Sequence, residues 1–221
     1  MSLTEHTYRP EIDGLRMIAV VAVVLYHFGV PGFGGGFAGV DVFFVISGYL
    51  IGGILWREAQ ATGRISLARF HIRRVKRLAP AFFAMALAAS VIAWLVLLPF
   101  EFREYGKSLI AATVYLSNVL FFRGAGYFDT AAESKVLLHT WSLSVEEQFY
   151  IFLPLTLLLL ARWPRVFIGT LWLCFAVSLV ASVWVTPSHQ TATFYLFPFR
   201  AWELLVGVLL AIWSYGRAPF R

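Results

Sequence analysis

One uninterrupted apolar segment constrains this sequence more than any other feature. Residues 78–100 contain no ionisable side chain, and about 20 apolar residues are enough for a helix to cross the hydrocarbon core of a bilayer. The whole chain of 221 residues is 60% hydrophobic and only 14% charged, whereas soluble domains carry about 25% charged residues. A water-soluble globular domain is therefore excluded. A disordered chain is excluded as well, because it would contain few aromatic residues.

Other stretches poor in ionisable side chains bring the number of predicted membrane segments to seven. The predicted segments are residues 17–30, 40–56, 78–99, 107–122, 145–161, 166–186 and 192–214. We expect an all-α fold, a polytopic bundle of transmembrane helices that forms a single membrane domain over residues 1–221. The one cysteine, Cys174, lies in an apolar run and provides neither a disulfide framework nor a Cys-based metal site.

Positive charge is concentrated in one stretch. Residues 57–77 carry a net charge of +6, which equals the formal net charge of the whole chain. A basic loop between apolar segments is typical of the cytoplasmic side, which predicts a cytoplasmic N-terminus. Charge confined to one loop argues against a nucleic-acid partner and suits an anionic cofactor or anionic lipid.

The later spans leave two topologies open. Simple alternation places Arg162 and Arg165 outside, against the positive-inside tendency. If residues 107–122, which include Ser117 and Asn118, enter and leave on one side as a broken or re-entrant segment, both arginines return to the inside. We favour this second topology.

The first span combines an acid, a guanidinium and an imidazole. His27 lies well inside the apolar run and follows Arg16 by eleven residues, so both face the same way, about 16 Å apart along a helix. Asp13 lies near the same line if the helix begins early enough. Ionisable groups within spans are functional candidates, and imidazole is the usual general base near neutral pH. Alternatively, Arg16 lies at the cytoplasmic interface and His27 bonds a neighbouring helix.

Arginines in the basic stretch recur at helical spacing. Arg69, Arg73 and Arg77 are four residues apart, and Arg74 with Arg77 forms an R-x-x-R pair. If the stretch is helical, one face presents several guanidinium groups, which bind phosphate bidentately. The alternative is a topology determinant that contacts lipid headgroups.

Polar residues precede the predicted segment 145–161. If Ser144 caps that helix, Glu147 three residues later completes a capping box, but this leaves His139, Trp141 and Glu146 unexplained. Paired carboxylates beside an aromatic ring at a membrane boundary suit a hydroxyl-rich ligand.

A glycine-rich turn precedes the second span. Its glycines permit close approach of the backbone, and Asp41 stands at the head of the apolar segment, either as a functional group or as an acid that favours the first turn of a helix. The sequence contains no metal-ligand spacing, phosphate-binding loop, dinucleotide fingerprint or G-x-S-x-G elbow.

Four stretches taken together resemble the acyltransferase-3 family of integral membrane acyltransferases, which includes bacterial O-antigen and other surface-glycan O-acetyltransferases. They are YRPEIDGLRMIAVVAVVLYHFG, GGGFAGVDVFFVISGYLIGGIL, FHIRRVKRLAP and LLHTWSLSVEEQFYIFLPL, in the family's order. The resemblance implies transfer of an acyl group, usually acetyl from cytoplasmic acetyl-CoA, to a sugar hydroxyl on the outer side of the membrane. Implied acceptors are O-antigen, exopolysaccharide or peptidoglycan, and the implied location is the bacterial cytoplasmic (inner) membrane.

The resemblance also implies roles for particular residues. Arg16 and His27 fall on the family's essential arginine and histidine, Arg74 and Arg77 on its R-x-x-R motif, and residues 146–147 on its S-x-x-V-E-E-Q-F-Y segment.

From the residue patterns and the family resemblance together, we expect the basic stretch to hold the phosphates of acyl-CoA. The candidates are Arg69, Arg73, Arg74 and Arg77. His27 would act as general base or accept the acyl group as a relay, with Arg16 and Asp13 as further catalytic candidates. The substrate-binding candidates are Asp41, His139, Trp141, Glu146 and Glu147.

Two other interpretations stay open. A transporter or flippase for a lipid-linked sugar would use His27 and the carboxylates to relay protons or bind cargo, without consuming acyl-CoA. Family members usually have more spans than the seven predicted here, and the most similar subgroup often carries a C-terminal extracytoplasmic SGNH hydrolase-like domain. The sequence is therefore expected to be a partial member, which inserts into the membrane and is either active or inactive.

Overall fold

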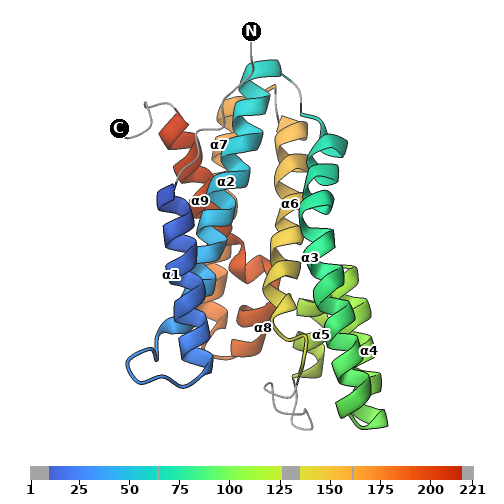
Figure 1. Cartoon of the computed structure of the whole chain (residues 1–221). Helices are drawn as coiled ribbons and strands as arrows, with labels where there is room; N and C mark the ends of the chain where they lie inside the picture. Colours follow the sequence, from blue (N-terminus) through green and yellow to red (C-terminus); the bar gives the residue numbers. More distant parts are fainter. Residues whose placement is uncertain (1–9, 64, 126–134, 161, 216–221) are drawn as a thin grey trace. The chain divides into compact units, whose positions relative to one another are not determined.

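The structure, a computed structural model, describes residues 10–63, 65–125, 135–160 and 162–215. Across these ranges all regular structure is helical (Figure 1), which confirms the all-α prediction. In chain order the elements are α1 Pro10–His27, the short 3₁₀ helix η1 Gly36–Ala38, α2 Gly39–Thr62, α3 Leu67–Val96, α4 Pro99–Thr113, α5 Ser117–Gly124, α6 Thr140–Leu160, α7 Pro164–Val185, α8 Gln190–Tyr195 and α9 Phe197–Tyr215.

Five segments in the described part of the chain are long and apolar enough to cross a membrane. They lie in α2, α3, α6, α7 and α9, and they fit a multi-pass membrane protein. The predicted count of seven is not confirmed. The 18 residues of α1 include Glu11, Asp13 and Arg16, and residues 107–122 are divided between α4 and α5 instead of forming one helix.

The helices pack into two compact units. Unit 1 comprises Met1–Gly53 with Glu203–Arg221, and unit 2 comprises Ile54–Trp202. Helices α2 and α9 each contribute one part to unit 1 and one part to unit 2.

In unit 1, glycines bring α2 and α9 into backbone contact. A methyl group added at Gly48 would overlap the backbone of Leu204, and one added at Gly207 would overlap the backbone of Val45. Gly48 and Gly52 are four residues apart, the small-x-x-x-small spacing that lets membrane helices approach closely. A larger side chain at these positions would therefore force the two helices apart.

Close approach also joins η1 and the start of α2 to α1. A methyl group at Gly36 would overlap the carbonyl of Ala22, and one at Gly39 would overlap the carbonyl of Ala19. The close backbone approach expected from the glycine-rich turn is confirmed at these two positions. It places the first turn of α2 beside the C-terminal half of α1.

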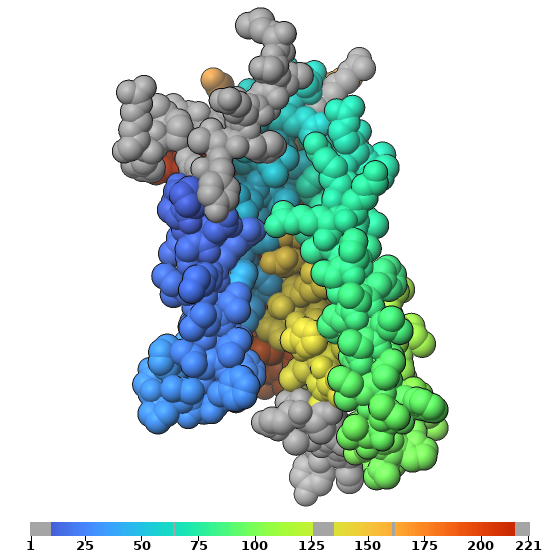
Figure 2. All heavy atoms as spheres, viewed as in Figure 1, coloured from blue at the N-terminus to red at the C-terminus, as the bar shows by residue number. Residues whose placement is uncertain are grey.

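In unit 2, α6 is the central helix and contacts α4, α5, α7 and α8. Its buried side chains include Val145, Phe149 and Leu153, each at most 1% exposed. By contrast, α3 leaves long stretches of its apolar surface exposed (Figure 2). A long apolar helix with so little of its surface packed against protein suits contact with lipid.

The prediction that residues 57–77 form a loop is wrong. Helix α2 continues to Thr62, α3 begins at Leu67, and only residues 63–66 connect them. Ser66 caps α3, because its hydroxyl oxygen accepts a hydrogen bond from the backbone nitrogen of Arg69 at 3.4 Å. The physical reason is that Ala, Leu, Arg and Lys are good helix formers, so the basic charge lies on two helix ends.

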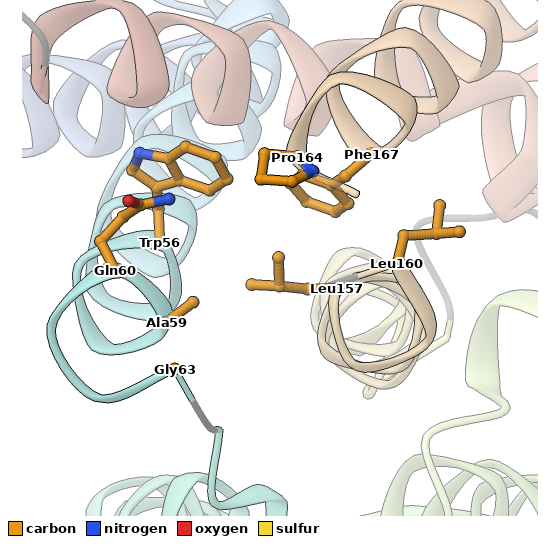
Figure 3. A pocket seen from close by; sticks show the side chains of 8 residues that line it. All are labelled: Trp56, Ala59, Gln60, Gly63, Leu157, Leu160, Pro164 and Phe167. Atoms are coloured by element: carbon orange, nitrogen blue, oxygen red, sulfur yellow. The ribbon is translucent and has the colours of Figure 1, made fainter. Parts of the chain in front are cut away.

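The end of α2 and the connection from α6 to α7 lie at the same end of unit 2. Ala59 lines one pocket together with Leu160 and Pro164 (Figure 3). Arg162 and Arg165 therefore lie at the same end of unit 2 as the basic helix ends. The topology with a broken segment before α6 predicts this arrangement, and simple alternation does not.

Candidate functional site

Helix α1 carries the acid, guanidinium and imidazole that the sequence placed on one stripe. Because α1 begins at Pro10, Asp13 lies within the helix. Nη1 of Arg16 is 3.6 Å from Oδ1 of Asp13, and the two side chains are 30% and 49% exposed. Water screens an ion pair with this much exposure, so the contact orients Arg16 more than it stabilises the helix.

His27 is the last residue of α1 and is exposed, so the helix ends within the apolar run that was predicted to continue to residue 30. The chain leaves the helix here because Gly29 adopts a φ of 65°, which favours glycine. Nδ1 of His27 lies 2.8 Å from the carbonyl oxygen of Val23. A carbonyl only accepts, so Nδ1 carries the hydrogen and Nε2 of the neutral ring keeps its lone pair.

Asp41 is the third residue of α2 and half-buried. This position in the first turn suits the interpretation as an acid that complements a helix N-terminus. Since η1 and the start of α2 pack on α1 through Gly36 and Gly39, Asp41 and His27 lie at the same end of unit 1. Unit 1 thus holds one group of predicted residues, in α1 and at the start of α2.

In unit 2, a nearly buried ion pair joins α3 to α6. Nε and Nη2 of Arg74 both donate to Oε1 of Glu147, at 3.2 and 2.8 Å, and the side chains are 15% and 10% exposed. The Arg74 guanidinium also lies over the ring of Tyr150, 3.6 Å from its centroid. The hydroxyl of Tyr150 donates to Glu146 at 3.3 Å. Arg74 and both glutamates therefore belong to one cluster.

The capping-box interpretation of Ser144 and Glu147 is wrong. Helix α6 begins at Thr140, so both residues lie inside it. The hydroxyl oxygen of Ser144 lies 2.7 Å from that of Ser117 on α5, and Glu147 bonds Arg74 instead of the helix start. Both side chains therefore join α6 to neighbouring helices.

An amide pair fixes the break between α4 and α5 against α6. Nε2 of Gln148 donates to Oδ1 of Asn118 at 2.9 Å and to the carbonyl oxygen of Tyr115 at 3.1 Å. Tyr115 has a φ of 56° and is the one non-glycine residue with positive φ in the described ranges. Such a conformation is uncommon for a bulky residue and costs free energy. The sequence reveals the polar residues of this segment but not their partners.

The charges of the Arg74–Glu147 pair also shift the pKa of the Tyr115 hydroxyl. Burial raises the pKa of the Tyr115 hydroxyl, the charge of Glu147 raises it further, and the charge of Arg74 lowers it. The hydroxyl is therefore neutral at physiological pH, in the electrostatic field of the cluster. No pattern in the sequence singles out this tyrosine.

The other predicted arginines form a separate, exposed face of α3. Arg69, Arg73 and Arg77 are all exposed, whereas Arg74 is turned about 100° away from Arg73. Nη2 of Arg73 lies 3.8 Å from Oε2 of Glu58. The structure thus brings three of the four predicted phosphate ligands onto one surface and directs the fourth towards α6.

His139 and Trp141 lie at the start of α6, where α8 packs against it. Trp141 is 7% exposed, and its ring centroid is 4.5 Å from that of Phe194 on α8. The guanidinium of Arg200 lies over both rings, at 5.7 and 5.9 Å. More than a third of His139 is exposed, yet the surrounding protein removes enough water to lower the pKa of its ring.

A comparison with known families decides the assignment. The family model described as "Acyltransferase domain" matches residues 9–221. The chain belongs to the acyltransferase-3 family. This confirms the resemblance carried by the four sequence stretches.

Relatives in the family bear related names. The chain is 37% identical over 217 residues to the protein named "Peptidoglycan O-acetyltransferase OatA" of Listeria monocytogenes, covering 95% of this chain and 35% of that protein. It is 38% identical to a "Putative O-acetyltransferase" of Staphylococcus aureus, covering 97% and 36%. It is 36% identical to the "Putative peptidoglycan O-acetyltransferase YrhL" of Bacillus subtilis, covering 96% and 34%. The chain thus spans about a third of the length of these relatives. No solved structure matches it.

For this family member, the structure adds functional candidates to the predicted site residues. Tyr150 links Glu146 to the Arg74 guanidinium, and Tyr115 lies in the field of the same cluster. Arg200 contacts the predicted Trp141. An aromatic residue four positions after Glu146 was visible as a possible partner on one helix face, whereas the contacts of Tyr115 and Arg200 arise only from packing.

Proposed function

We propose that this chain transfers an acyl group, most simply acetyl, from acyl-CoA to a hydroxyl of a cell-surface glycan. Family membership supports acyl transfer, and the names of the relatives point to acetyl as the group and peptidoglycan as one class of acceptor. The observation that carries the proposal is the geometry of His27. Its Nδ1 is bound to the Val23 carbonyl, which makes Nε2 the basic nitrogen.

Two routes use that nitrogen. In the first, Nε2 of His27 takes the proton of the sugar hydroxyl while the hydroxyl oxygen attacks the thioester carbonyl. The carbon–sulfur bond breaks, and the leaving thiolate of CoA receives the proton. In the second, Nε2 itself attacks the carbonyl and expels the thiolate. The sugar oxygen then attacks the acyl group, the carbon–nitrogen bond to Nε2 breaks, and the freed Nε2 takes the hydroxyl proton. Arg16, oriented by Asp13, lies about 16 Å from His27 along α1, so it would contact the pantetheine arm of the donor and not the reacting carbonyl.

The donor is proposed to bind through the exposed face of α3. Arg69, Arg73 and Arg77 present guanidinium groups to solvent, and such groups bind phosphate bidentately. Arg74 has a different proposed role, since both of its bonds to Glu147 hold α3 against α6. Replacing Arg74 would then affect the fold before it affects donor binding.

The acceptor side is proposed to use the remaining predicted residues. Carboxylates accept hydrogen bonds from sugar hydroxyls, and Asp41 and Glu146 are only half-buried. His139 stands next to the start of α6, beside the aromatic group around Trp141. Glu147 would act indirectly, through Arg74.

The test is a transfer assay in membranes. Membranes that contain this chain, and separately its longest natural form, receive acetyl-labelled CoA and are scored for label in surface glycan. The variant His27→Ala should lower transfer by at least about 100-fold, the usual contribution of a general base. The control His189→Ala changes an exposed histidine at the start of α8 and should leave transfer unchanged.

The outcomes separate the alternatives. Normal transfer by the inserted His27→Ala variant would reject the role of His27. Label retained on the protein and released by hydroxylamine would favour the relay over the general base. Movement of unmodified lipid-linked sugar with no loss of acyl-CoA would instead identify a flippase.

A further inference from the structure

None of the residues that line one pocket in unit 2 is among the predicted site residues. The pocket forms where the last turns of α2 and α6 meet the first turn of α7, and its walls include Trp56, Ala59, Gln60, Leu157, Leu160 and Phe167. The side chains surround an open centre (Figure 3). The rings of Trp56 and Phe167 stack with centroids 5.8 Å apart and planes 12° apart, which makes one flat, rigid apolar wall.

Most side chains that line the pocket are apolar. Apart from the amide of Gln60, the walls named above consist of aromatic, leucine and alanine side chains, and the small side chain of Ala59 leaves space between the larger ones. The volume inside the pocket, about 40 Å³, is far below the roughly 300–1,000 Å³ of pockets that enclose a whole small molecule. Such a space suits part of one hydrocarbon chain better than a complete nucleotide cofactor.

Basic residues stand close in sequence to residues that line the pocket. Arg57 follows Trp56, Arg165 follows Pro164, and Arg162 precedes Pro164 by two residues; all three arginines are exposed. The neighbouring acid, Glu58, contacts Arg73 at 3.8 Å, so its charge is already matched. The N-terminus of α7 adds partial positive charge. The rim therefore favours an anion.

We propose that this pocket binds an anionic phospholipid. One acyl chain enters between Trp56 and the leucines of α6, and the phosphate group contacts Arg162 and Arg165. The pocket lies at the ends of three candidate membrane spans, which is where lipid headgroups begin, and basic pockets between membrane helices bind anionic headgroups. Tryptophan is also enriched at this depth.

The experiment reads Trp56 directly and uses no activity measurement, so it is independent of the proposed acyl transfer. The purified full chain is reconstituted into phosphatidylcholine vesicles in which a rising mole fraction is replaced by phosphatidylglycerol or phosphatidylcholine with brominated acyl chains. Bromine quenches nearby tryptophan fluorescence. The Trp56 component is the difference between the wild type and Trp56→Phe, which keeps an aromatic ring to stack on Phe167.

Two double variants test whether Arg162 and Arg165 cause the preference for the anionic lipid. Brominated phosphatidylglycerol should quench the fluorescence of Trp56 more effectively than brominated phosphatidylcholine, because two arginines favour the anionic headgroup. We expect half-maximal quenching at a mole fraction lower by about tenfold or more. The double variant Arg162→Gln/Arg165→Gln should abolish that preference, and Arg103→Gln/Lys107→Gln, at exposed positions on α4, should retain it. Trp172 on α7 is exposed and serves as a control. Its fluorescence, obtained as the difference between the wild type and Trp172→Phe, should be quenched equally by both brominated lipids.

Three results would overturn the assignment. The first is equal quenching of the Trp56 component by both lipids. The second is a preference for phosphatidylglycerol that survives loss of Arg162 and Arg165. The third is loss of quenching when acetyl-CoA is added at saturating concentration, which would assign the pocket to the acyl donor.

Discussion

The two groups of candidate residues differ in how far apart their partners lie along the chain. In unit 1, Asp13 and Arg16 are three residues apart, and His27 bonds a carbonyl four residues earlier. In unit 2, Arg74 bonds Glu147, 73 residues later. The first contacts need only one helix, and the second require α3 and α6 to be packed.

This difference suggests that the residues of unit 1 take part in the reaction and that the Arg74–Glu147 pair of unit 2 stabilises the fold. The groups of unit 1 are substantially exposed, so they can exchange water for substrate at little cost. The Arg74–Glu147 pair is nearly buried, and losing one partner leaves a charge without its counterpart. We therefore expect changes in unit 1 to act mainly on turnover and changes in this pair to act first on stability.

The largest stability effect is expected from Glu147→Ala. It leaves the Arg74 guanidinium nearly buried without its acceptor, which costs about 3–5 kcal/mol of unfolding free energy. The measurement is SDS-induced unfolding in mixed micelles. Glu104→Ala is the control, because it removes an exposed pair with Lys107 at 2.7 Å and should cost less than about 1 kcal/mol.

A double variant sharpens this prediction. Arg74→Met with Glu147→Leu removes both charges and keeps apolar volume, so it should recover much of the stability lost in Glu147→Ala. If Glu147→Ala is as stable as Glu104→Ala, the pair does not hold α3 against α6.

Next in size is the effect of the exposed arginine face on donor binding. Arg69→Gln, Arg73→Gln and Arg77→Gln combined should raise KM for acetyl-CoA by about tenfold or more, since charge-assisted hydrogen bonds contribute about 1.5–3 kcal/mol each. The rate constant kcat should change little, because the phosphates are remote from the reacting carbonyl. Steady-state kinetics in vesicles measures both constants, and an unchanged KM would refute the assignment.

A smaller effect should come from the backbone of Tyr115. Valine and asparagine are similar in size, but asparagine tolerates positive φ and valine does not. Tyr115→Val should therefore be about 1–3 kcal/mol less stable than Tyr115→Asn, measured by the same unfolding assay. Equal stability of the two variants would mean that the chain does not hold the left-handed conformation at this position.

Spacing along one helix predicted several features correctly. Asp13 and Arg16 lie on one side of α1, as predicted, close enough to form an ion pair. The four-residue repeat of Arg69, Arg73 and Arg77 became one exposed face. These are properties of a single helix and depend only on its periodicity. The functional roles of these residues stay predictions.

Packing between helices could not be predicted from spacing. Nothing local distinguishes Arg74, which bonds α6, from Arg73, which stays exposed. The role of Ser144 was misjudged because a serine before an apolar run also occurs at helix starts, and only its contact with Ser117 shows that it lies within α6. Contacts between residues far apart in the sequence depend on how the helices pack, and the residues around each position do not reveal that packing.

The smallest effect is expected from Asp13→Asn. The pair with Arg16 is separated by 3.6 Å and both partners are solvated, so the unfolding free energy should change by less than about 1 kcal/mol. Transfer activity should fall only modestly, far less than in His27→Ala, because Arg16 keeps its charge and loses only an orienting contact. Raising the salt concentration should shrink the difference between Asp13→Asn and wild type, since ions screen exposed charges. A loss of activity as large as that of His27→Ala, insensitive to salt, would instead show that Asp13 contacts the reacting groups, and that the contacts within α1 do more than orient Arg16.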